Sequence, residues 1–353
     1  MAAEAGVDGL AASLGLSEAE AARAGAAASK AWANGWGESL PDAQAAVEQV
    51  IGNIPGMRQA TEDTLTSITE KAMAFAQAFD VDVSEATRNV GVMLETGLAR
   101  SAEHAFDMMV TASQQVGPAM RGELSDAIHE YSQFFAGLGF TGEQAIGMLA
   151  DAAAGGTYAI DKLGDSIKEF RIRATDGSTA TADAYKVLGL SAHQMANDVL
   201  AGGSRANAAF TEIVTRLQDI KDPALQAQTA IALFGAPFED IAGDGAKVDE
   251  LLQTMTTSTL PNSAGAAQKL ADTLSDNLAT DVEQTQRKIQ NLSTEIGNKL
   301  LGSVNKLPQP LQGFALGVLA VSDAVGPAIT NVGLLALAIK GGGMAGGAGR
   351  LIG

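Results

Sequence analysis

The chain has 353 residues, enough for two or three compact domains or for one elongated helical array. Its net charge of −18 argues against sequence-specific nucleic-acid binding, because neutralising phosphates requires clustered lysine and arginine side chains. Since there is no cysteine, disulfides, thiol nucleophiles and thiolate metal sites are excluded.

Composition and periodicity predict helices throughout. Apolar residues make up 46% of the chain but aromatic residues only 5%, and alanine accounts for most of the difference. Alanine favours helix and has little volume, so the helices should pack closely around thin cores. Strand-like alternation is almost absent. The predicted fold class is all-α: an elongated array of short helices, then a long coiled-coil-like helix, then an apolar, glycine-rich helical segment.

Breaks in the pattern divide the chain into four predicted regions. Residues 1–55 form an N-terminal helical segment, and residues 56–260 form a multi-helix module. Residues 261–307 form a long helix and candidate coiled coil, and residues 308–353 form an apolar segment and candidate membrane-active region.

Three corners between helices share one pattern. Residues 14–20, 138–144 and 188–194 each contain a leucine, a glycine, an apolar residue and then S/T-x-x-E/Q. The glycine suits the end of one helix, and the last four residues form the capping box that begins the next. The spacings of 124 and 50 residues are irregular, so we expect corners in a helical array and not a repeat protein.

The densest basic cluster lies between Lys162 and Arg173. Its basic residues alternate with apolar ones; the members are Lys162, Ile167, Lys168, Phe170, Arg171, Ile172 and Arg173. A nucleic-acid or membrane face is one interpretation. The acidity of the chain favours the other, an amphipathic helix whose apolar side is core and whose basic end complements the helix dipole.

A short heptad pattern follows residue 264. Val282, Ile289 and Ile296 are seven residues apart, and Leu292 occupies the matching d position. Apolar residues at four-residue steps, Leu270, Leu274 and Leu278, precede them. We expect one nearly unbroken helix over 264–307; whether it associates with copies of itself or packs on its own domain stays open.

Residues 313–339 are apolar and long enough to cross a bilayer, which takes about 20 residues. Asp323 interrupts them, and a charge at mid-membrane is costly. The segment is therefore either a poor transmembrane helix or a helical hairpin buried against identical copies. The chain stops at Gly353 without a closing domain, so we expect the natural protein to be longer.

Motifs for chemistry are absent from the sequence. His104, His129 and His193 lie on different predicted helices without partner ligands, which favours surface or cap positions. The carboxylates are scattered at helix-surface spacing and do not form an acid–base pair. We expect no enzyme activity, no metal and no cofactor.

The order of features in residues 163–235 resembles the central module of bacteriophage or prophage tail tape-measure proteins. A basic amphipathic helix is followed by Asp176-Gly177-Ser178, then by Leu188-Gly189-Leu190-Ser191, and the segment closes on Leu233-Phe234-Gly235. The likeness extends over about residues 86–245, with a looser one at residues 30–50. It marks Leu188, Gly189, Leu190, Leu233, Phe234 and Gly235 as structural or interaction residues.

The resemblance implies a structural rod that sets the length of the tail tube during assembly and is expelled during DNA ejection. It further implies a homo-oligomer, with a trimer favoured, located in the tail lumen of the virion and in the host cytoplasm during assembly. The implied partners are the tail-tube protein, tail assembly chaperones, tail-tip proteins and, at ejection, the host membrane.

One departure from the family is the number of glycine corners before residue 260. Tape-measure proteins are dominated by long helices, so this chain resembles the head module and the start of the rod. Two alternatives remain: a membrane-inserting helical toxin or secreted effector, and a cytoplasmic coiled-coil scaffold.

Overall fold

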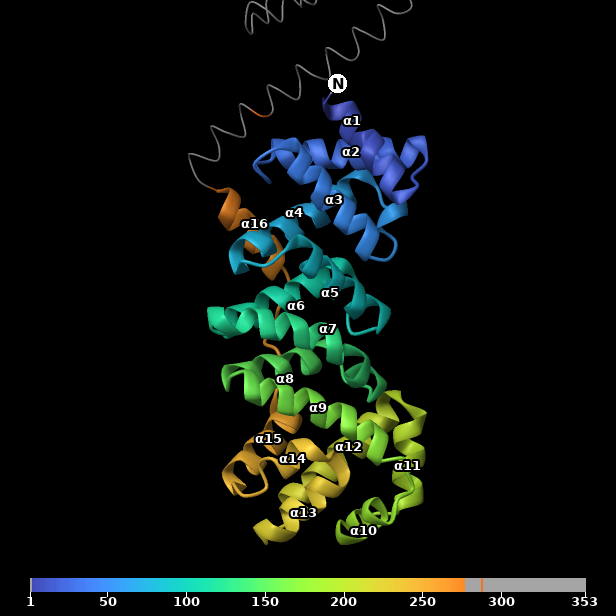
Figure 1. Ribbon diagram of the computed structural model, residues 1–353, viewed down its shortest axis with the longest axis vertical. Coiled ribbons are helices and arrows are strands. Elements are labelled where there is room, and N and C mark those ends of the chain that lie inside the picture. Colours follow the sequence, from blue (N-terminus) through green and yellow to red (C-terminus); the bar gives the residue numbers. More distant parts are fainter. Residues whose placement is uncertain (1, 277–286, 288–353) are drawn as a thin grey trace, which may run out of the picture. The chain divides into compact units, whose positions relative to one another are not determined.

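The computed structural model describes residues 2–276 and Arg287, and every regular element in them is helical (Figure 1). The all-α prediction is confirmed for this part of the chain. The helices are α1 (Ala2–Leu14), α2 (Glu18–Ala33), α3 (Leu40–Asn53), η1 (Met57–Gln59), α4 (Glu62–Phe79), α5 (Val83–Glu95), α6 (Ala102–Gln115), η2 (Pro118–Met120), α7 (Arg121–Gly137), α8 (Gly142–Ala154), α9 (Thr157–Arg173), α10 (Thr179–Val187), α11 (Ala192–Ala201), α12 (Gly203–Gln218), α13 (Pro223–Phe234), α14 (Ala236–Glu239), α15 (Gly245–Thr257) and α16 (Ala266–Ser275).

The predicted corners begin helices as expected. At Ser17 and at Thr141 both bonds of the capping box are present. At Ser191 the hydroxyl accepts the N–H of Gln194 at 3.3 Å. Gly139, in the second corner, has a φ of 73°, and a Cβ there would lie 2.0 Å from the carbonyl oxygen of Gly203. A side chain at this corner is therefore excluded both by backbone conformation and by space.

Helices α1 to α9 stack in two alternating layers. Helices two apart in sequence pack together at every step, and sequence neighbours pack together at nearly every step. One layer holds the odd-numbered helices and the other the even-numbered ones, in chain order (Figure 1). The packing is regular even though the predicted corners are irregularly spaced in the sequence. The regularity lies in the packing, while helix length varies from 13 residues in α1 to 18 in α4.

One hydrophobic core runs through the stack from Leu10 to Ala267. The predicted divisions at residues 55 and 260 both fall inside the compact unit Met1–Arg287. Beyond α9 the chain folds around that helix: α13, α14 and α15 pack on α9, and α12 packs on α11 and α15.

After α15 the chain turns back along the even-numbered layer. Residues 258–275, which we call the return segment, pass α8, α6 and α4 in reverse order and end in α16, which packs on α6 and α4 (Figure 1). The predicted, nearly unbroken helix over 264–307 has a break at Asp276, and most of the span beyond it lies outside the described residues. Helix α16 begins at Ala266 and ends at Ser275, and Asp276 leaves helical geometry with φ −90° and ψ 72°. The apolar periodicity did not reveal this end, because it reports which face is buried and not whether the backbone continues.

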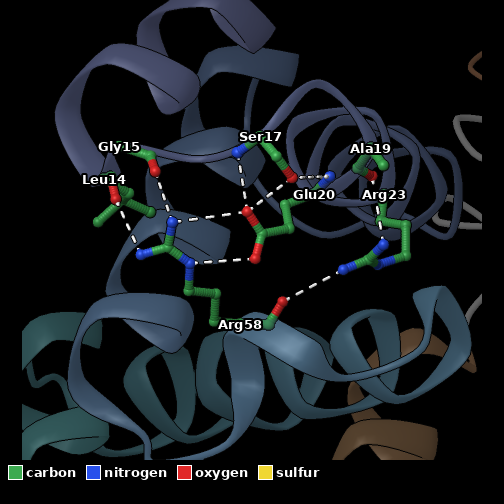
Figure 2. Close-up of polar contacts among 7 residues, drawn as sticks. All are labelled: Leu14, Gly15, Ser17, Ala19, Glu20, Arg23 and Arg58. Atoms are coloured by element: carbon green, nitrogen blue, oxygen red, sulfur yellow. Dashed lines mark hydrogen bonds and ion pairs between the residues drawn. The ribbon is translucent and has the colours of Figure 1, made fainter.

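Arg58 of η1 holds the corner between α1 and α2, as Figure 2 shows. Its guanidinium donates to the carbonyl oxygens of Leu14 at 3.4 Å and Gly15 at 2.5 Å, which the end of α1 leaves without helical partners. It also donates to the Glu20 carboxylate at 3.1 Å. The backbone N–H of Ser17, then Arg58 and the Ser17 hydroxyl, lower the pKa of Glu20 to about 2.

Two predicted features lie outside the described residues. One is the set of heptad positions Val282, Ile289, Leu292 and Ile296; the other is the apolar stretch 313–339 with Asp323. Within residues 2–276, none of the helices combines the length and the apolar character that crossing a membrane requires.

Candidate functional site

The return segment is the candidate functional site, because it connects the stacked helices to the rest of the chain. Its first anchor is on α8, where the N–H of Leu260 donates to the carbonyl oxygen of Glu143 at 2.9 Å. Gly147 makes this approach possible: a Cβ there would lie 2.5 Å from the backbone nitrogen of Leu260 and from the carbonyl carbon of Thr259. Glycine in mid-helix disfavours the helix, so its presence indicates a requirement for close backbone contact.

A buried histidine joins α6 to α8 beneath this anchor. His104 is 6% exposed; its Nδ1 accepts the N–H of Arg100 at 3.4 Å, and its Nε2 lies 3.0 Å from Glu143 Oε1. Because Nδ1 is an acceptor, Nε2 carries the proton and donates to the carboxylate. Burial raises the pKa of Glu143, but hydrogen bonds from its own backbone N–H and from His104 outweigh that effect and lower it. Of the surface or cap positions expected for the histidines, His104 takes a cap position, in the first turn of α6, but it is buried, whereas His129 and His193 are exposed.

The second anchor is Asp107 on α6. Its carboxylate accepts the N–H of Gly265 at 2.8 Å and the N–H of Ala267 at 2.9 Å. Gly265 stands at the N-cap of α16 and has no side chain with which to cap the helix. Asp107 therefore supplies, from another helix, the oxygen that a serine or aspartate normally provides at that position, and its charge suits the helix N-terminus.

The third anchor is Lys71 on α4. This lysine is buried, and its Nζ donates to Ser67 Oγ at 2.7 Å and to Gln268 Oε1 at 2.8 Å. Farther along, Arg287 donates to the carbonyl oxygens of Trp32, in the last turn of α2, at 3.3 Å and of Gly37, just after it, at 2.9 Å. The contacts thus follow α8, α6, α4 and α2 in order.

The predicted LGLS corner joins α10 to α11. Leu188 is buried, Leu190 is partly buried, and Gly189 has a φ of 69°. The N–H of Leu190 donates to the carbonyl of Tyr185 at 2.8 Å. Arg216 of α12 donates to the Leu188 carbonyl at 2.9 Å, so this corner is tied to a third helix.

The predicted LFG triplet ends α13 inside an aromatic cluster. Leu233 and Phe234 are fully buried, and Gly235 has a φ of 68°. Phe234 stacks on Phe170 of α9 with ring centroids 5.1 Å apart, and Phe238 lies 5.1 Å from Phe234. Phe210 of α12 and Phe140 extend the cluster by edge-on contacts at 5.0 and 5.2 Å. Five phenylalanines from separate elements therefore form the core that joins α9 to α12, α13 and α14.

Basic side chains of α9 form ion pairs with carboxylates of the same module. Lys162 pairs with Asp240, Lys168 lies 3.8 Å from Glu130, and Arg173 lies 3.0 Å from Glu169. On the other side of the helix, Ile167 and Phe170 are fully buried, while Ile172 is 56% exposed. This arrangement is typical of a helix that packs its apolar face into its own domain and leaves its charged face outside.

The contacts of the return segment can position the chain that follows it, but they bring no reactive side chains together. No group of three or more histidine and carboxylate side chains within residues 2–276 could hold a metal ion. Sequence reasoning missed this segment, as well as Arg58 and His104. The signal that could have found it is Gly147, within the otherwise helix-favouring sequence of α8.

Comparisons with known proteins agree on one kind of protein. The profile of a family described as phage-related minor tail protein matches residues 30–235. A protein of Streptomyces phage phiC31, described as a probable tape measure protein, is 34% identical over 267 residues. The aligned part covers 75% of this chain and 36% of that protein, so the chain spans about a third of the length of the curated relative it matches. No solved structure matches the chain.

Proposed function

We propose a structural role in the phage tail for this chain, which belongs to the phage-related minor tail proteins, the family of tape-measure proteins. The stacked helices of residues 2–276 would form a compact anchoring module of the tape-measure protein, and other parts of the protein would form the rod that fixes tube length. The observation that carries this proposal is the family match over residues 30–235, which covers α3 to α13 and four of the five phenylalanines of the aromatic cluster.

The packing of the module supports its role as an anchor that is distinct from the rod. Helices α1 to α9 lie side by side, and packed helix axes are about 8–10 Å apart. A straight helix instead adds about 1.5 Å for every residue. Side-by-side stacking therefore gains little length from many residues, which suits an anchor and not a ruler.

We propose as partners further copies of the chain, with a trimer favoured, together with the tail-tube protein, assembly chaperones and tail-tip proteins. The protein would act without catalysis, in the tail lumen of the virion and, during assembly, in the host cytoplasm. Its net charge of −18 would keep it from adhering to DNA that passes through the same tube. Residues 313–339 would meet the host membrane at ejection.

Tail length tests the proposal. In the phage or prophage that encodes the chain, in-frame deletions in the rod-coding part should shorten tails by about 1.5 Å per deleted residue. Substitutions that unfold the module should lower the yield of tails without changing their length. Tails of unchanged length after the deletions would contradict a measuring role.

A further inference from the structure

Helix α16 presents one apolar face to the stack. Ala267, Leu270, Ala271 and Leu274 follow the i, i+3, i+4, i+7 spacing of a single helix face. Ala267 and Ala271 are buried, and the two leucines are partly buried against the core. Between them, Lys269, Asp272 and Thr273 are exposed.

The side chains that α16 buries are small. The fully buried side chains of α16 are alanines, which bury little apolar area. Its polar anchors include the Asp107 cap and the bond between Lys71 and Gln268. Elements with few buried apolar contacts open more readily than the core they pack on.

The same apolar pattern continues in the sequence beyond α16. The four-residue steps Leu270 and Leu274 lead to Leu278 and then to the heptad positions that begin at Val282. The matching helix of another copy is one partner that can bury a heptad pattern. A face of α16 that lies on α4 and α6 cannot pair with a second copy at the same time.

We propose that the α16 face has two mutually exclusive partners: helices α4 and α6 of its own chain, and the corresponding face of a second copy. Docking of the return segment holds the chain apart from its copies, and release of α16 allows them to associate. This inference rests on the proposed assembly of several copies in one tail.

Locking the return segment in place tests it. Ser67 Oγ and Gln268 Oε1 lie 2.7 and 2.8 Å from the same Lys71 nitrogen, and the chain has no cysteine. The double variant Ser67→Cys/Gln268→Cys can therefore be joined by a short bifunctional thiol reagent. In sedimentation velocity over a range of concentrations, the unlinked full-length chain should associate and the linked chain should remain monomeric.

A matched control joins two helices of the stack and leaves α16 free. Lys30 and Asp63 form an ion pair at 2.5 Å between α2 and α4, so Lys30→Cys/Asp63→Cys should cross-link without affecting association. Equal association of the linked and unlinked Ser67→Cys/Gln268→Cys chains would overturn the proposal. Absence of association in both would also overturn it. Neither result depends on the tail-length experiment, so the two proposals can fail separately.

A second variant acts in the opposite direction. Asp107→Ala removes the oxygens that cap α16, and association should then occur at about tenfold lower concentration. Asp126→Ala on α7, an exposed carboxylate, removes the same charge and should leave association unchanged. Weaker association of Asp107→Ala would show that docking promotes the pairing of copies, contrary to the proposal.

Discussion

Phe170 of α9 and Phe234 of α13 stack with ring centroids 5.1 Å apart and an interplanar angle of 26°. Both side chains are fully buried, and Phe210 meets both rings edge-on. This contact fixes the helices beyond α9 to the end of the two-layer stack, so its loss should lower the stability of the whole module.

Replacement of Phe234 by alanine should lower the free energy of unfolding by about 3–5 kcal/mol, because the cavity cannot be filled by neighbouring rings without strain. Denaturant unfolding followed by circular dichroism measures the change. Leu225→Ala, at a residue that is 40% exposed on the same helix, is the control and should cost far less. Equal losses for the two variants would show that the cluster does not hold the module together.

Gly147→Ala should displace the return segment. The new methyl group would lie 2.5 Å from backbone atoms of Thr259 and Leu260, which cannot turn aside as a flexible side chain could. Amide exchange in residues 258–275 should become about tenfold faster, while α8 keeps its protection. Gly122→Ala on α7, where a Cβ meets nothing within 4 Å, should leave exchange unchanged. Unaltered exchange in Gly147→Ala would mean that the segment does not rest on α8.

The Glu20 carboxylate should make the α1–α2 corner sensitive to acid. Its pKa falls from 4.5 to about 2 on folding, through the Ser17 N–H, Arg58 and the Ser17 hydroxyl. The ionised form is therefore favoured by folding, and its stabilising contribution is complete above pH 4.5 and lost as the pH falls towards 2. The stability difference between the natural chain and Glu20→Gln should shrink over this range. A constant difference would rule out the lowered pKa.

The His104–Glu143 pair should show energetic coupling. Removal of either partner leaves the other without its hydrogen bond, and the histidine is buried. A double-mutant cycle with His104→Ala and Glu143→Ala should give a coupling of about 1 kcal/mol. Both variants keep the backbone carbonyl of residue 143 that binds Leu260, so a coupling near zero would locate the role of the histidine elsewhere.

Local features of this fold were predictable from sequence, and distant ones were not. The capping boxes at Ser17 and Thr141 depend on residues within one helical turn, so their spacing alone reveals them. The bond from Leu260 to Glu143 joins backbone groups, and backbone groups leave no trace in residue identity. Gly147 is the exception, because only the close approach explains a glycine in the middle of an alanine-rich helix.

The candidate site shows the same limit. The sequence pattern named Leu270 and Leu274 in α16, and both are partly buried against the stack. Two partners fit this face, and periodicity does not distinguish them. His104 was expected at a surface or cap position because no ligand partners were visible nearby in sequence, yet its partner Glu143 is 39 residues away.

The return segment also divides the synthesis of the chain into two stages. Contacts in the stack join helices one or two apart, so each pair can close soon after it leaves the ribosome. By contrast, Ala267 is 160 residues from Asp107, and Gln268 is 197 residues from Lys71. Such distant contacts raise contact order and slow the step that forms them. During translation, the apolar face of α4 and α6 is therefore exposed until α16 has been synthesised. Another helix can bind to this face in the meantime.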